Sequence, residues 1–405
     1  MATESVDLVI IGGGMAGGLL AAILAGGPLR VQLVDAAPVP QMPQGLARPR
    51  VSALTEASQR MLVRTGAWAK LPPERVQSYI RMQVWDGDGT GEVVFDAVEA
   101  GVPSLGWIVE NDAVVAALHQ ALATATNVRW HCDARVTRLQ RSAAGWQIAL
   151  ADGRELAAPM LVGADGARSS VRENAGIPGT LRPTGHLAIV GTVAMERPHG
   201  RCARQRFMDT GPLALLPLGG DGHHCSLVWS CLPAEAERLM ALDGDAFDVA
   251  LTQASQGCCG PLRLLGKRGL FPINELHASE YVSDGVALIG DAAHVVHPLA
   301  GQGINMGMLD AAVLAEEFER ASTRGLPFYH PSALARYQRR RRGHNALMLN
   351  VLHGFKVLFE QPSLEVRLMR NLGMNLFNRA APVKRMLTRH ALGRSGDLPA
   401  LARRN

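Results

Sequence analysis

This chain of 405 residues lacks the sequence features of membrane-spanning, secreted and metal-binding proteins. No run approaches the ~18 apolar residues of a membrane-spanning helix. The N-terminus carries an acid at position 4 and no basic stretch, so we expect a cytoplasmic protein rather than a secreted one. The six cysteines show neither the spacing of metal ligands nor a disulfide framework, so we expect small buried side chains and no metal.

What the chain does contain begins at its N-terminus, where an apolar run at residues 6–11 precedes a glycine-rich turn. Gly12, Gly14 and Gly17 form a Gly-x-Gly-x-x-Gly pattern that opens an Ala- and Leu-rich helix. In this pattern the first glycine makes a tight turn, the second lets a pyrophosphate approach the helix N-terminus, and the third lets helix and strand pack. A second apolar strand ends at Asp35, whose carboxylate can accept hydrogen bonds from ribose hydroxyl groups. The segment predicts FAD or NAD rather than NADP.

A second glycine-rich segment, residues 290–310, follows an apolar strand and leads into a helix with an apolar periodicity. Ligands of α/β sheets bind at such strand-to-helix crossovers. Gly301 and Gly303 have no Cβ where a flat ligand would approach the backbone, and the helix that begins near Ile304 can direct free N–H groups at a partly negative ring. Asp291 can accept hydrogen bonds from sugar-alcohol hydroxyl groups. The alternative is an ordinary glycine-containing loop.

A third segment, residues 160–172, ends a strand at Asp165 and opens a helix with Ser169 and Arg172. It brings a carboxylate, a hydroxyl group and guanidinium groups around one turn near the carboxyl edge of the sheet. Both a cofactor contact and a capped helix start with solvated arginines are compatible with this pattern.

Two histidines, His294 and His297, stand three residues apart in the second segment. Pro298 follows immediately and no carboxylate completes a ligand set, so no metal is predicted there. We interpret His294 as lining the cofactor site; the alternative is a packed, hydrogen-bonded core histidine.

Together, in this order and at these separations, the three segments resemble the class A flavoprotein aromatic hydroxylases of the para-hydroxybenzoate hydroxylase fold. More narrowly, residues 297–310 are similar to the signature of the ubiquinone-biosynthesis hydroxylases, as are residues 108–111, 206–207 and 211–217. The resemblance covers nearly the whole chain. It implies an FAD-dependent monooxygenase that hydroxylates an aromatic ring of a polyprenylated phenol or quinol intermediate of ubiquinone biosynthesis through a flavin C4a-hydroperoxide.

The resemblance also implies how the cofactor is held. Arg50 would reach the non-covalently bound FAD, the backbone at Val136 would contact adenine, and the backbone from Gly303 to Asn305 would face the pyrimidine edge of the flavin. NAD(P)H would supply electrons, and O2 and a small apolar aromatic substrate would be the other partners. No second Gly-x-Gly-x-x-Gly marks a separate NAD(P)H domain, and no side chain stands out as a catalytic base. The candidate cofactor-binding residues are Gly12, Gly14, Met15, Ala16, Gly17, Asp35, Arg50, Val136, Asp165, Asp291, Pro298, Gly301, Gly303, Ile304 and Asn305.

The order of strand and helix patterns predicts an α/β fold with α+β insertions. We expect a Rossmann-like FAD-binding domain, a discontinuous β-sheet substrate domain with alternating strand patterns and turn signals, and a C-terminal helical segment. The predicted bounds are 1–75, 104–180 and 270–330 for the FAD-binding domain, 76–103 and 181–269 for the substrate domain, and 331–405 for the C-terminal segment.

This C-terminal segment is strongly basic. It holds 15 Lys and Arg against 3 Asp and Glu, a net charge of +12, which leaves −7 for the rest of a chain whose total is +5. An apolar helical stripe formed by Met348, Leu352, Phe355 and Phe359 lies beside the arginines at 339–342. The helix could pack on the FAD-binding domain with solvated arginines, meet an anionic membrane surface, or bind a partner in a biosynthetic complex. We favour the inner membrane surface, because a polyprenylated substrate would be found there. Reversing the four arginines should then weaken vesicle binding and leave FAD in place.

Other functions stay open. The chain could be a class A flavin monooxygenase of another apolar aromatic compound or an alkene, or a flavin-binding scaffold subunit of a biosynthetic complex. The presence of all three cofactor segments argues against a scaffold. Nucleic acid is not expected as a partner, because the basic segment contains no known motif for nucleic-acid recognition.

Overall fold

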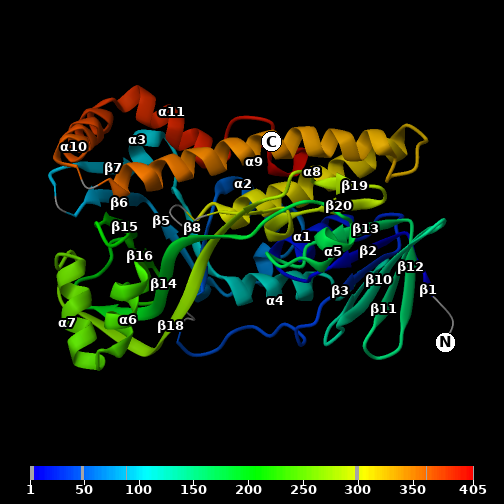
Figure 1. Ribbon diagram of the computed structural model, residues 1–405, viewed down its shortest axis with the longest axis horizontal. Helices are drawn as coiled ribbons and strands as arrows, with labels where there is room; N and C mark the ends of the chain where they lie inside the picture. Colours follow the sequence, from blue (N-terminus) through cyan, green and yellow to red (C-terminus); the bar gives the residue numbers. More distant parts are fainter. Residues whose placement is uncertain (1–3, 47–49, 88, 297–300, 362, 405) are drawn as a thin grey trace.

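The computed structural model describes residues 4–46, 50–87, 89–296, 301–361 and 363–404. A six-stranded sheet and an eight-stranded sheet form the two halves of an elongated molecule (Figure 1). The chain passes between the halves several times, so each half is built from segments that are far apart in the sequence. One long helix, α9 (Pro331–Glu360), runs along both halves.

The six-stranded sheet has the strand order β19-β20-β13-β2-β3-β9, and every neighbouring pair is parallel except β19 with β20. Strands β2, β13 and β20 are short apolar runs in which every residue is buried, as expected for parallel strands that are covered on both faces. The strands are β2 (Leu8–Ile11), β3 (Val31–Val34), β9 (Val128–His131), β13 (Met160–Gly163), β19 (Val282–Ser283) and β20 (Val286–Leu288).

Helices and a four-stranded sheet of order β1-β12-β11-β10 complete this half and share one core with the six-stranded sheet. Trp146, Ile148 and Leu156 of the four-stranded sheet belong to that core. The elements are α1 (Met15–Leu24), α4 (Asn111–Ala121), α5 (Ser170–Asn174), η3 (Gly290–Ala292), α8 (Gly303–Thr323), β1 (Glu4–Ser5), β10 (Val136–Ser142), β11 (Gly145–Leu150) and β12 (Glu155–Ala158).

A three-stranded antiparallel sheet, β4-β8-β5, and α2 lead from this half towards the other. Thr55 caps α2 by accepting a hydrogen bond from the backbone N–H of Ser58. The elements are β4 (Val51–Leu54), α2 (Glu56–Arg64), η1 (Trp68–Lys70), η2 (Pro73–Arg75), β5 (Val76–Tyr79) and β8 (Gly106–Glu110).

The eight-stranded sheet has the order β21-β18-β14-β17-β16-β15-β6-β7. Strand β6 pairs in parallel with β15, which joins the two segments predicted to form a substrate domain. The predicted boundary at residue 270 lies inside β18, and β21, which follows the six-stranded sheet, pairs with the end of β18. The elements are β6 (Arg81–Asp86), β7 (Glu92–Asp96), α3 (Ala97–Ala100), β14 (Arg182–Met195), β15 (Cys202–Phe207), β16 (Leu213–Pro217), β17 (His224–Cys231), α6 (Pro233–Ala241), α7 (Gly244–Ala254), β18 (Leu262–His277) and β21 (His294–Val295).

The C-terminal segment is helical, as predicted, and connects the two halves. Helix α9 packs against α8 at its beginning, whereas Leu352 and Phe359 are buried beside Phe207 of the eight-stranded sheet. Helix α10 (Leu364–Arg379) lies on β7, α11 (Ala381–Ala391) lies on α3, and η5 (Ala400–Ala402) lies on α2. Among the described residues, no helix has the length and apolar character needed to cross a bilayer.

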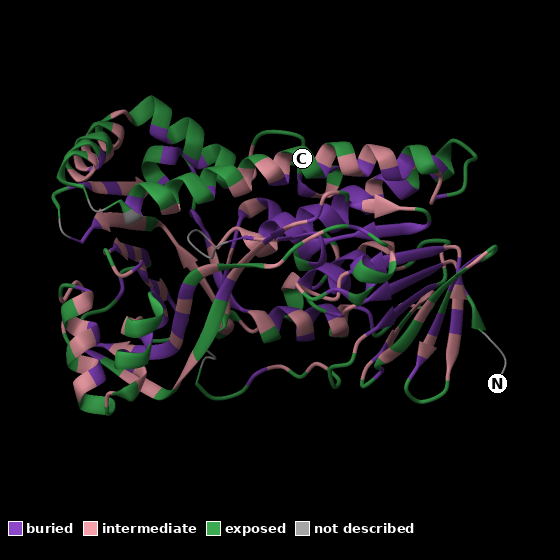
Figure 2. Cartoon of the chain, in the orientation of Figure 1, coloured by how far each residue is buried: buried purple, intermediate pink, exposed green. Residues whose placement is uncertain are grey.

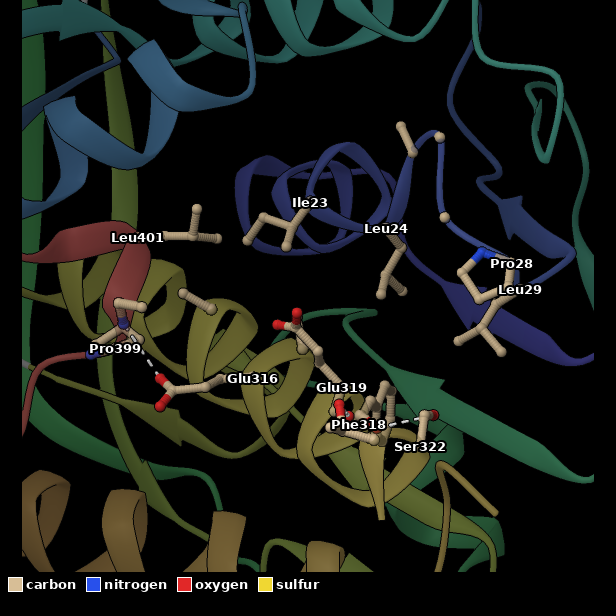
Figure 3. Close-up of a pocket in the computed structure, with 17 residues that line it drawn as sticks. Ile23, Leu24, Pro28, Leu29, Glu316, Phe318, Glu319, Ser322, Pro399 and Leu401 are labelled. Atoms are coloured by element: carbon tan, nitrogen blue, oxygen red, sulfur yellow. Dashed lines mark hydrogen bonds between the residues drawn. The ribbon is translucent and has the colours of Figure 1, made fainter. Parts of the chain in front are cut away.

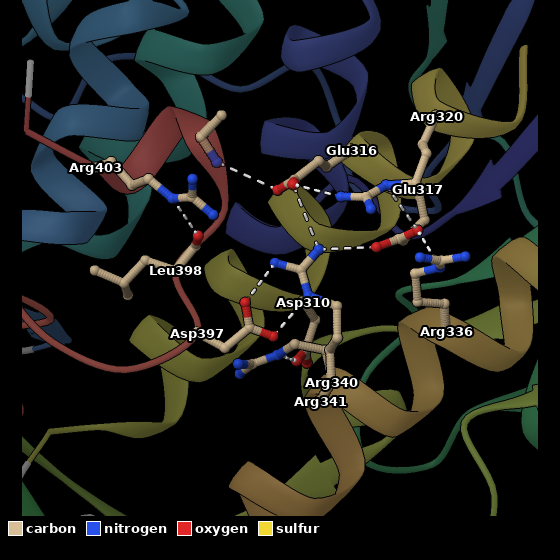
Figure 4. Close-up of polar contacts among 11 residues, drawn as sticks. Asp310, Glu316, Glu317, Arg320, Arg336, Arg340, Arg341, Asp397, Leu398 and Arg403 are labelled. Atoms are coloured by element: carbon tan, nitrogen blue, oxygen red, sulfur yellow. Dashed lines mark hydrogen bonds and ion pairs between the residues drawn. The ribbon is translucent and has the colours of Figure 1, made fainter. Parts of the chain in front are cut away.

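The arginines at 339–342 are not a solvated basic cluster. Arg341 is buried against Asp310, and Arg340 forms ion pairs with Glu317 and Asp397 (Figure 4). Two of these charges hold α9 to the rest of the protein, so reversing all four arginines would also break contacts within the fold. The expected loss of vesicle binding with FAD left in place stays a prediction. Two members of the apolar stripe are buried as well, so that stripe is mainly a packing face.

Candidate cofactor and active site

A cavity of about 1010 Å³ lies at the carboxyl ends of β2, β3, β13 and β20. Its wall is formed by the segments that follow these strands, by the start of α4 and by the first turns of α1 and α8. Ligands of open parallel sheets bind at this edge, because the strand ends and the helix N-termini meet there. Nine of the predicted residues line the cavity: Gly14, Met15, Ala16, Asp35, Arg50, Asp291, Gly301, Gly303 and Ile304.

The first turn of α1 is open towards the cavity. Gly14 is the N-cap residue, no described side chain caps the helix, and a Cβ placed there would meet no described atom within 4 Å. Gly12 has a φ of +105°, and its Cβ would lie 2.2 Å from the carbonyl oxygen of Ala164. A Cβ at Gly17 would lie 2.0 Å from the carbonyl oxygen of Gly12. Gly12 and Gly17 thus serve the turn and its packing, whereas Gly14 leaves room for an anion at the helix N-terminus.

Asp35 stands at the end of β3 with its carboxylate in the cavity wall. It accepts hydrogen bonds from the backbone N–H of Gly13 (2.6 Å) and of Ala37 (2.8 Å). These two donors hold the carboxylate beside the first turn of α1. A carboxylate has about four acceptor positions, so Asp35 retains capacity for ribose hydroxyl groups.

Asp291 lies in η3, directly after β20, and opens onto the same cavity. Its carboxylate is accessible from the cavity but surrounded by protein elsewhere. This desolvation raises the pKa of Asp291 above its usual value, while His294 and Arg50 pull the pKa in the opposite direction. Buried Arg172 donates hydrogen bonds to the carbonyl oxygens of Ala292 and Ala167, which ties the Asp291 turn to the segment after β13.

Beneath this turn lies a buried polar network that joins α8, α9 and the segment after β20. Asp310 is its centre: it accepts hydrogen bonds from Gly290 N (3.1 Å), His294 Nε2 (2.5 Å) and Arg341 Nε (2.7 Å). Asn345 Nδ2 adds a further bond at 3.1 Å. Burial alone would raise the pKa of Asp310, but His294 and Arg341 outweigh it and hold that pKa well below its ordinary value. His294 is thus a hydrogen-bonded core histidine, the alternative interpretation, and it is not among the residues that line the cavity.

Asp165 and Val136 are not among the residues that line the cavity. Asp165 accepts hydrogen bonds from Ser169, Ser170 and Val171 at the start of α5, so its side chain acts as part of a helix cap. Val136 opens β10. Pro298 lies outside the described residues. The roles predicted for these residues in cofactor binding stay predictions.

Asn305 is also directed away from the cavity. Its side chain accepts hydrogen bonds from the backbone N–H of Thr55 and the hydroxyl group of Ser58, and donates to the carbonyl oxygens of Ala53 and Gly301. Asn305 therefore fastens the first turn of α8 to β4 and α2. Its backbone, rather than this side chain, is the part that was predicted to face a flavin.

Sequence reasoning missed several residues in the cavity wall. Asn111, Asp112 and Val115 reach it from α4, and the apolar side chains of Val295 and Val296 line it from the side of the eight-stranded sheet. The position of Asn111 directly after a buried strand is a signal that could have identified it. Val296 also belongs to an apolar cluster with Phe207, Met306, Leu352 and Phe359, so one end of the cavity adjoins an apolar region.

A second cavity, of about 410 Å³, lies between the end of α1, α8 and η5 (Figure 3). Its wall is mostly apolar, with Ile23, Leu24 and Phe318, and carries the carboxylates of Glu316 and Glu319. None of the described candidate residues lines it, and it lies at the opposite end of α1 from the glycine-rich turn. It is therefore not the cofactor site.

Comparison with known proteins identifies the class. Residues 5–349 match a family model described as FAD binding domain. The solved structure of the p-nitrophenol 4-monooxygenase PnpA from Pseudomonas putida superimposes with a TM-score of 0.78 at 19% identity, over 96% of this chain and 99% of that chain. The predicted α/β fold is confirmed, and it is the fold of FAD-dependent aromatic monooxygenases.

Two relatives of higher identity narrow the assignment. The ubiquinone hydroxylase UbiL of Rhodospirillum rubrum is 37% identical over 396 residues, which cover 97% of this chain and 90% of the relative. The 3-demethoxyubiquinol 3-hydroxylase of Escherichia coli is 34% identical over 394 residues, which cover 97% of this chain and 100% of the relative. The chain belongs to the FAD-dependent ubiquinone-biosynthesis hydroxylases, which confirms the family and the enzyme class predicted from the sequence.

Proposed function

We propose that this protein hydroxylates an aromatic ring of a polyprenylated phenol or quinol intermediate of ubiquinone biosynthesis, with NADH or NADPH as the electron source. The observation that carries the proposal is the cavity at the carboxyl edge of the six-stranded sheet, whose polar wall meets an apolar end. The names of the relatives support the substrate class, because one is a ubiquinone hydroxylase and another acts on demethoxyubiquinol.

In this proposal the polar wall holds FAD. The open N-terminus of α1 at Gly14 would receive the pyrophosphate, and Asp35 would accept hydrogen bonds from the adenosine ribose. Asp291 would bind the ribityl chain, and the first turn of α8, at Gly303 and Ile304, would face the flavin ring. These features suit a dinucleotide. The uncapped helix end and the open space at Gly14 can take its pyrophosphate, and the carboxylates in the wall can take its hydroxyl groups.

Reduced FAD supplies the oxygen activation, and the chain supplies binding, orientation and exclusion of water. Backbone N–H groups at the start of α8 would stabilise negative charge on the pyrimidine edge, since the N-terminal end of a helix is partly positive. Val295 and Val296 would pack against the substrate ring at the apolar end of the cavity. The eight-stranded sheet, which adjoins that end, would carry the rest of the substrate, so that the two predicted domains serve cofactor and substrate.

The test is product analysis in a bacterial strain that lacks the corresponding hydroxylase. The strain should regain ubiquinone when this chain is expressed, and the position of the new hydroxyl group in accumulated intermediates identifies the ring carbon. If the protein is expressed with FAD bound and no hydroxylated quinone appears, the proposed substrate is wrong.

Hydroxylation of another apolar aromatic compound is the second candidate, because the same fold is found in a p-nitrophenol monooxygenase. Oxidation of NADH or NADPH by the purified protein with a panel of phenols separates the two. Stimulation by simple phenols but not by prenylated ones would favour the second candidate, and no turnover with any substrate would favour a flavin-binding scaffold.

A further inference from the structure

Two neighbouring helices of the C-terminal segment expose an apolar surface that the fold does not use. On α10, Leu364, Leu368, Met369, Leu372 and Leu376 are 57–73% exposed. On α11, Val383, Met386 and Leu387 are exposed as well. These eight side chains are called the outer apolar face below. In Figure 2 both helices are largely green, at the corner of the molecule beyond β7.

Helix α10 is attached to β7 mainly by polar side chains. Asn371, Asn375 and Asn378, which share one side of the helix, accept hydrogen bonds from consecutive backbone segments of the β7 edge: from Gly91 N, from Glu92 N (3.2 Å) and from Val94 N (3.0 Å). Arg370, the buried residue of α10, forms an ion pair with Asp86 at 2.5 Å. Three asparagines thus cover the edge strand β7.

Helix α11 is attached in the same way. Its two buried residues are Lys384 and Thr388, both polar. Lys384 Nζ donates to the carbonyl oxygen of Val94 (2.9 Å) and pairs with Glu99 (2.8 Å). A surface helix normally turns its apolar side to the protein and its polar side to water. Met374 and Phe377 of α10 follow this rule, since they pack near Phe207 and against Phe95. The outer apolar face has the opposite arrangement, so its eight residues are not explained by packing against the described part of the chain.

The charge around this face indicates what covers it. Residues 347–391 contain seven Lys and Arg and two Glu. Arg367, Arg370 and Lys384 pair with Asp209, Asp86 and Glu99, which lie outside this segment, so a net charge of +2 remains. Arg379, Arg385 and Arg389 are exposed. Interfaces between proteins are usually anchored by aromatic side chains, whereas every residue of the outer apolar face is Leu, Met or Val. Aliphatic side chains with arginines at their edge are typical of helices that lie in the surface of an anionic bilayer.

We propose that the outer apolar face of α10 and α11 inserts into the surface of an anionic phospholipid bilayer and holds the protein there without crossing it. The inference goes beyond the proposed function, because it does not depend on which compound is hydroxylated. It also moves the membrane contact from the arginines at 339–342, of which Arg340 and Arg341 pair within the protein, to α10 and α11.

The proposal is tested by co-sedimentation of the FAD-loaded protein with vesicles of phosphatidylcholine mixed with phosphatidylglycerol, and with vesicles of phosphatidylcholine alone. The variant L368Q/L372Q/L376Q removes three aliphatic anchors and no contact that holds α10 to β7. We expect it to bind the mixed vesicles at least about tenfold more weakly than the wild type. The matched control is V63Q/L232Q/V249Q, which replaces three exposed apolar residues elsewhere and should bind like the wild type.

Flavin absorbance and the thermal unfolding midpoint check that both variants are folded. A second variant, Arg379→Glu, should weaken binding to the mixed vesicles and reduce its dependence on salt, because screening acts on the charge contribution. Equal vesicle binding by wild type and the triple Gln variant overturns the proposal. So does a wild-type dimer that the triple variant disrupts without any change in vesicle binding, since the face would then join two copies of the chain.

Discussion

The buried pair of Asp310 and Arg341 provides a direct test of how the C-terminal helix supports the cofactor cavity. Both side chains are at most 1% exposed, and Arg341 Nε lies 2.7 Å from Asp310 Oδ1. The substitution Arg341→Met keeps much of the side-chain volume but removes the cation. Because the Asp310 carboxylate is then left buried without its partner, the free energy of unfolding should fall by about 3–5 kcal/mol.

The same substitution should weaken cofactor binding at a distance. Asp310 also accepts hydrogen bonds from Gly290 N and His294 Nε2, and Gly290 directly precedes Asp291 in the cavity wall. A carboxylate that shifts or takes up a proton loosens that turn. We expect a loss of FAD affinity on the order of tenfold, or about 1.4 kcal/mol, measured by fluorescence titration of the apoprotein.

The loss of stability in the Arg341→Met variant should depend on pH, because the Asp310 carboxylate is charged only above its pKa. In the wild type the pKa of Asp310 is depressed, so its stabilising contribution is present above the unfolded value of about 3.9 and is lost only as the pH falls through the lower folded value. Without Arg341 the folded pKa rises, and the charged carboxylate destabilises the protein at neutral pH. The stability deficit should therefore shrink as the pH is lowered towards the raised pKa and the carboxyl group becomes neutral.

Urea unfolding at several pH values measures this deficit. The matched control is Arg339→Met, on the exposed side of the same helix, which should change stability little. Adding Asp310→Asn to Arg341→Met should recover part of the loss, because no charge is then left buried. A deficit no larger than that of the control, or one that is the same at every pH, would refute the role assigned to the pair.

Three further outcomes are expected. Denaturation of the purified yellow protein should release its flavin quantitatively as free FAD; flavin retained by the denatured chain, or FMN in the supernatant, would contradict the cofactor assignment. Asp291→Ala should weaken FAD binding by about 1.5–3 kcal/mol, roughly ten- to a hundred-fold, and unchanged affinity in a titration would show that Asp291 does not bind the ribityl chain. Gly12→Ala should greatly lower the thermal unfolding midpoint, because its Cβ would meet the Ala164 carbonyl, whereas Gly14→Ala should keep the fold and lose FAD affinity; the same stability for both variants would contradict the roles given to the two glycines.

The parts of the site that could be predicted are those whose structure is determined by residues close together in the sequence. A turn with positive φ and a close backbone approach permit only glycine, so Gly12 and Gly17 could be recognised within one strand-turn-helix unit. The apolar runs before the two glycine-rich segments are parallel strands buried on both faces, and such strands are recognisable without knowledge of their neighbours. The partners of charged and polar side chains were harder to predict. The side chain of His294 is predicted to line the cofactor site, and it instead bonds to the buried Asp310. The side chain of Asp165 bonds to the start of α5, between Ala164 and Gly166 in the cavity wall, so its contact with the cofactor stays a prediction.

The sequence by itself determined the family, through the resemblance of its motifs. It also determined the α/β fold and the positions of the strand ends at which the cavity forms, because these follow from apolar periodicity and from glycines whose backbone geometry is local. Only the tertiary structure decided which charges are solvated and which faces are covered. Arg339 and Arg341 are two residues apart in one basic run, yet one is exposed and the other is buried against Asp310. The leucines of α10 have the spacing of an ordinary packing face. In the structure, however, the asparagine side of the helix packs on β7, and the leucines are exposed. The spacing along a helix defines its faces, and the elements packed against the helix determine which face meets protein and which is left exposed.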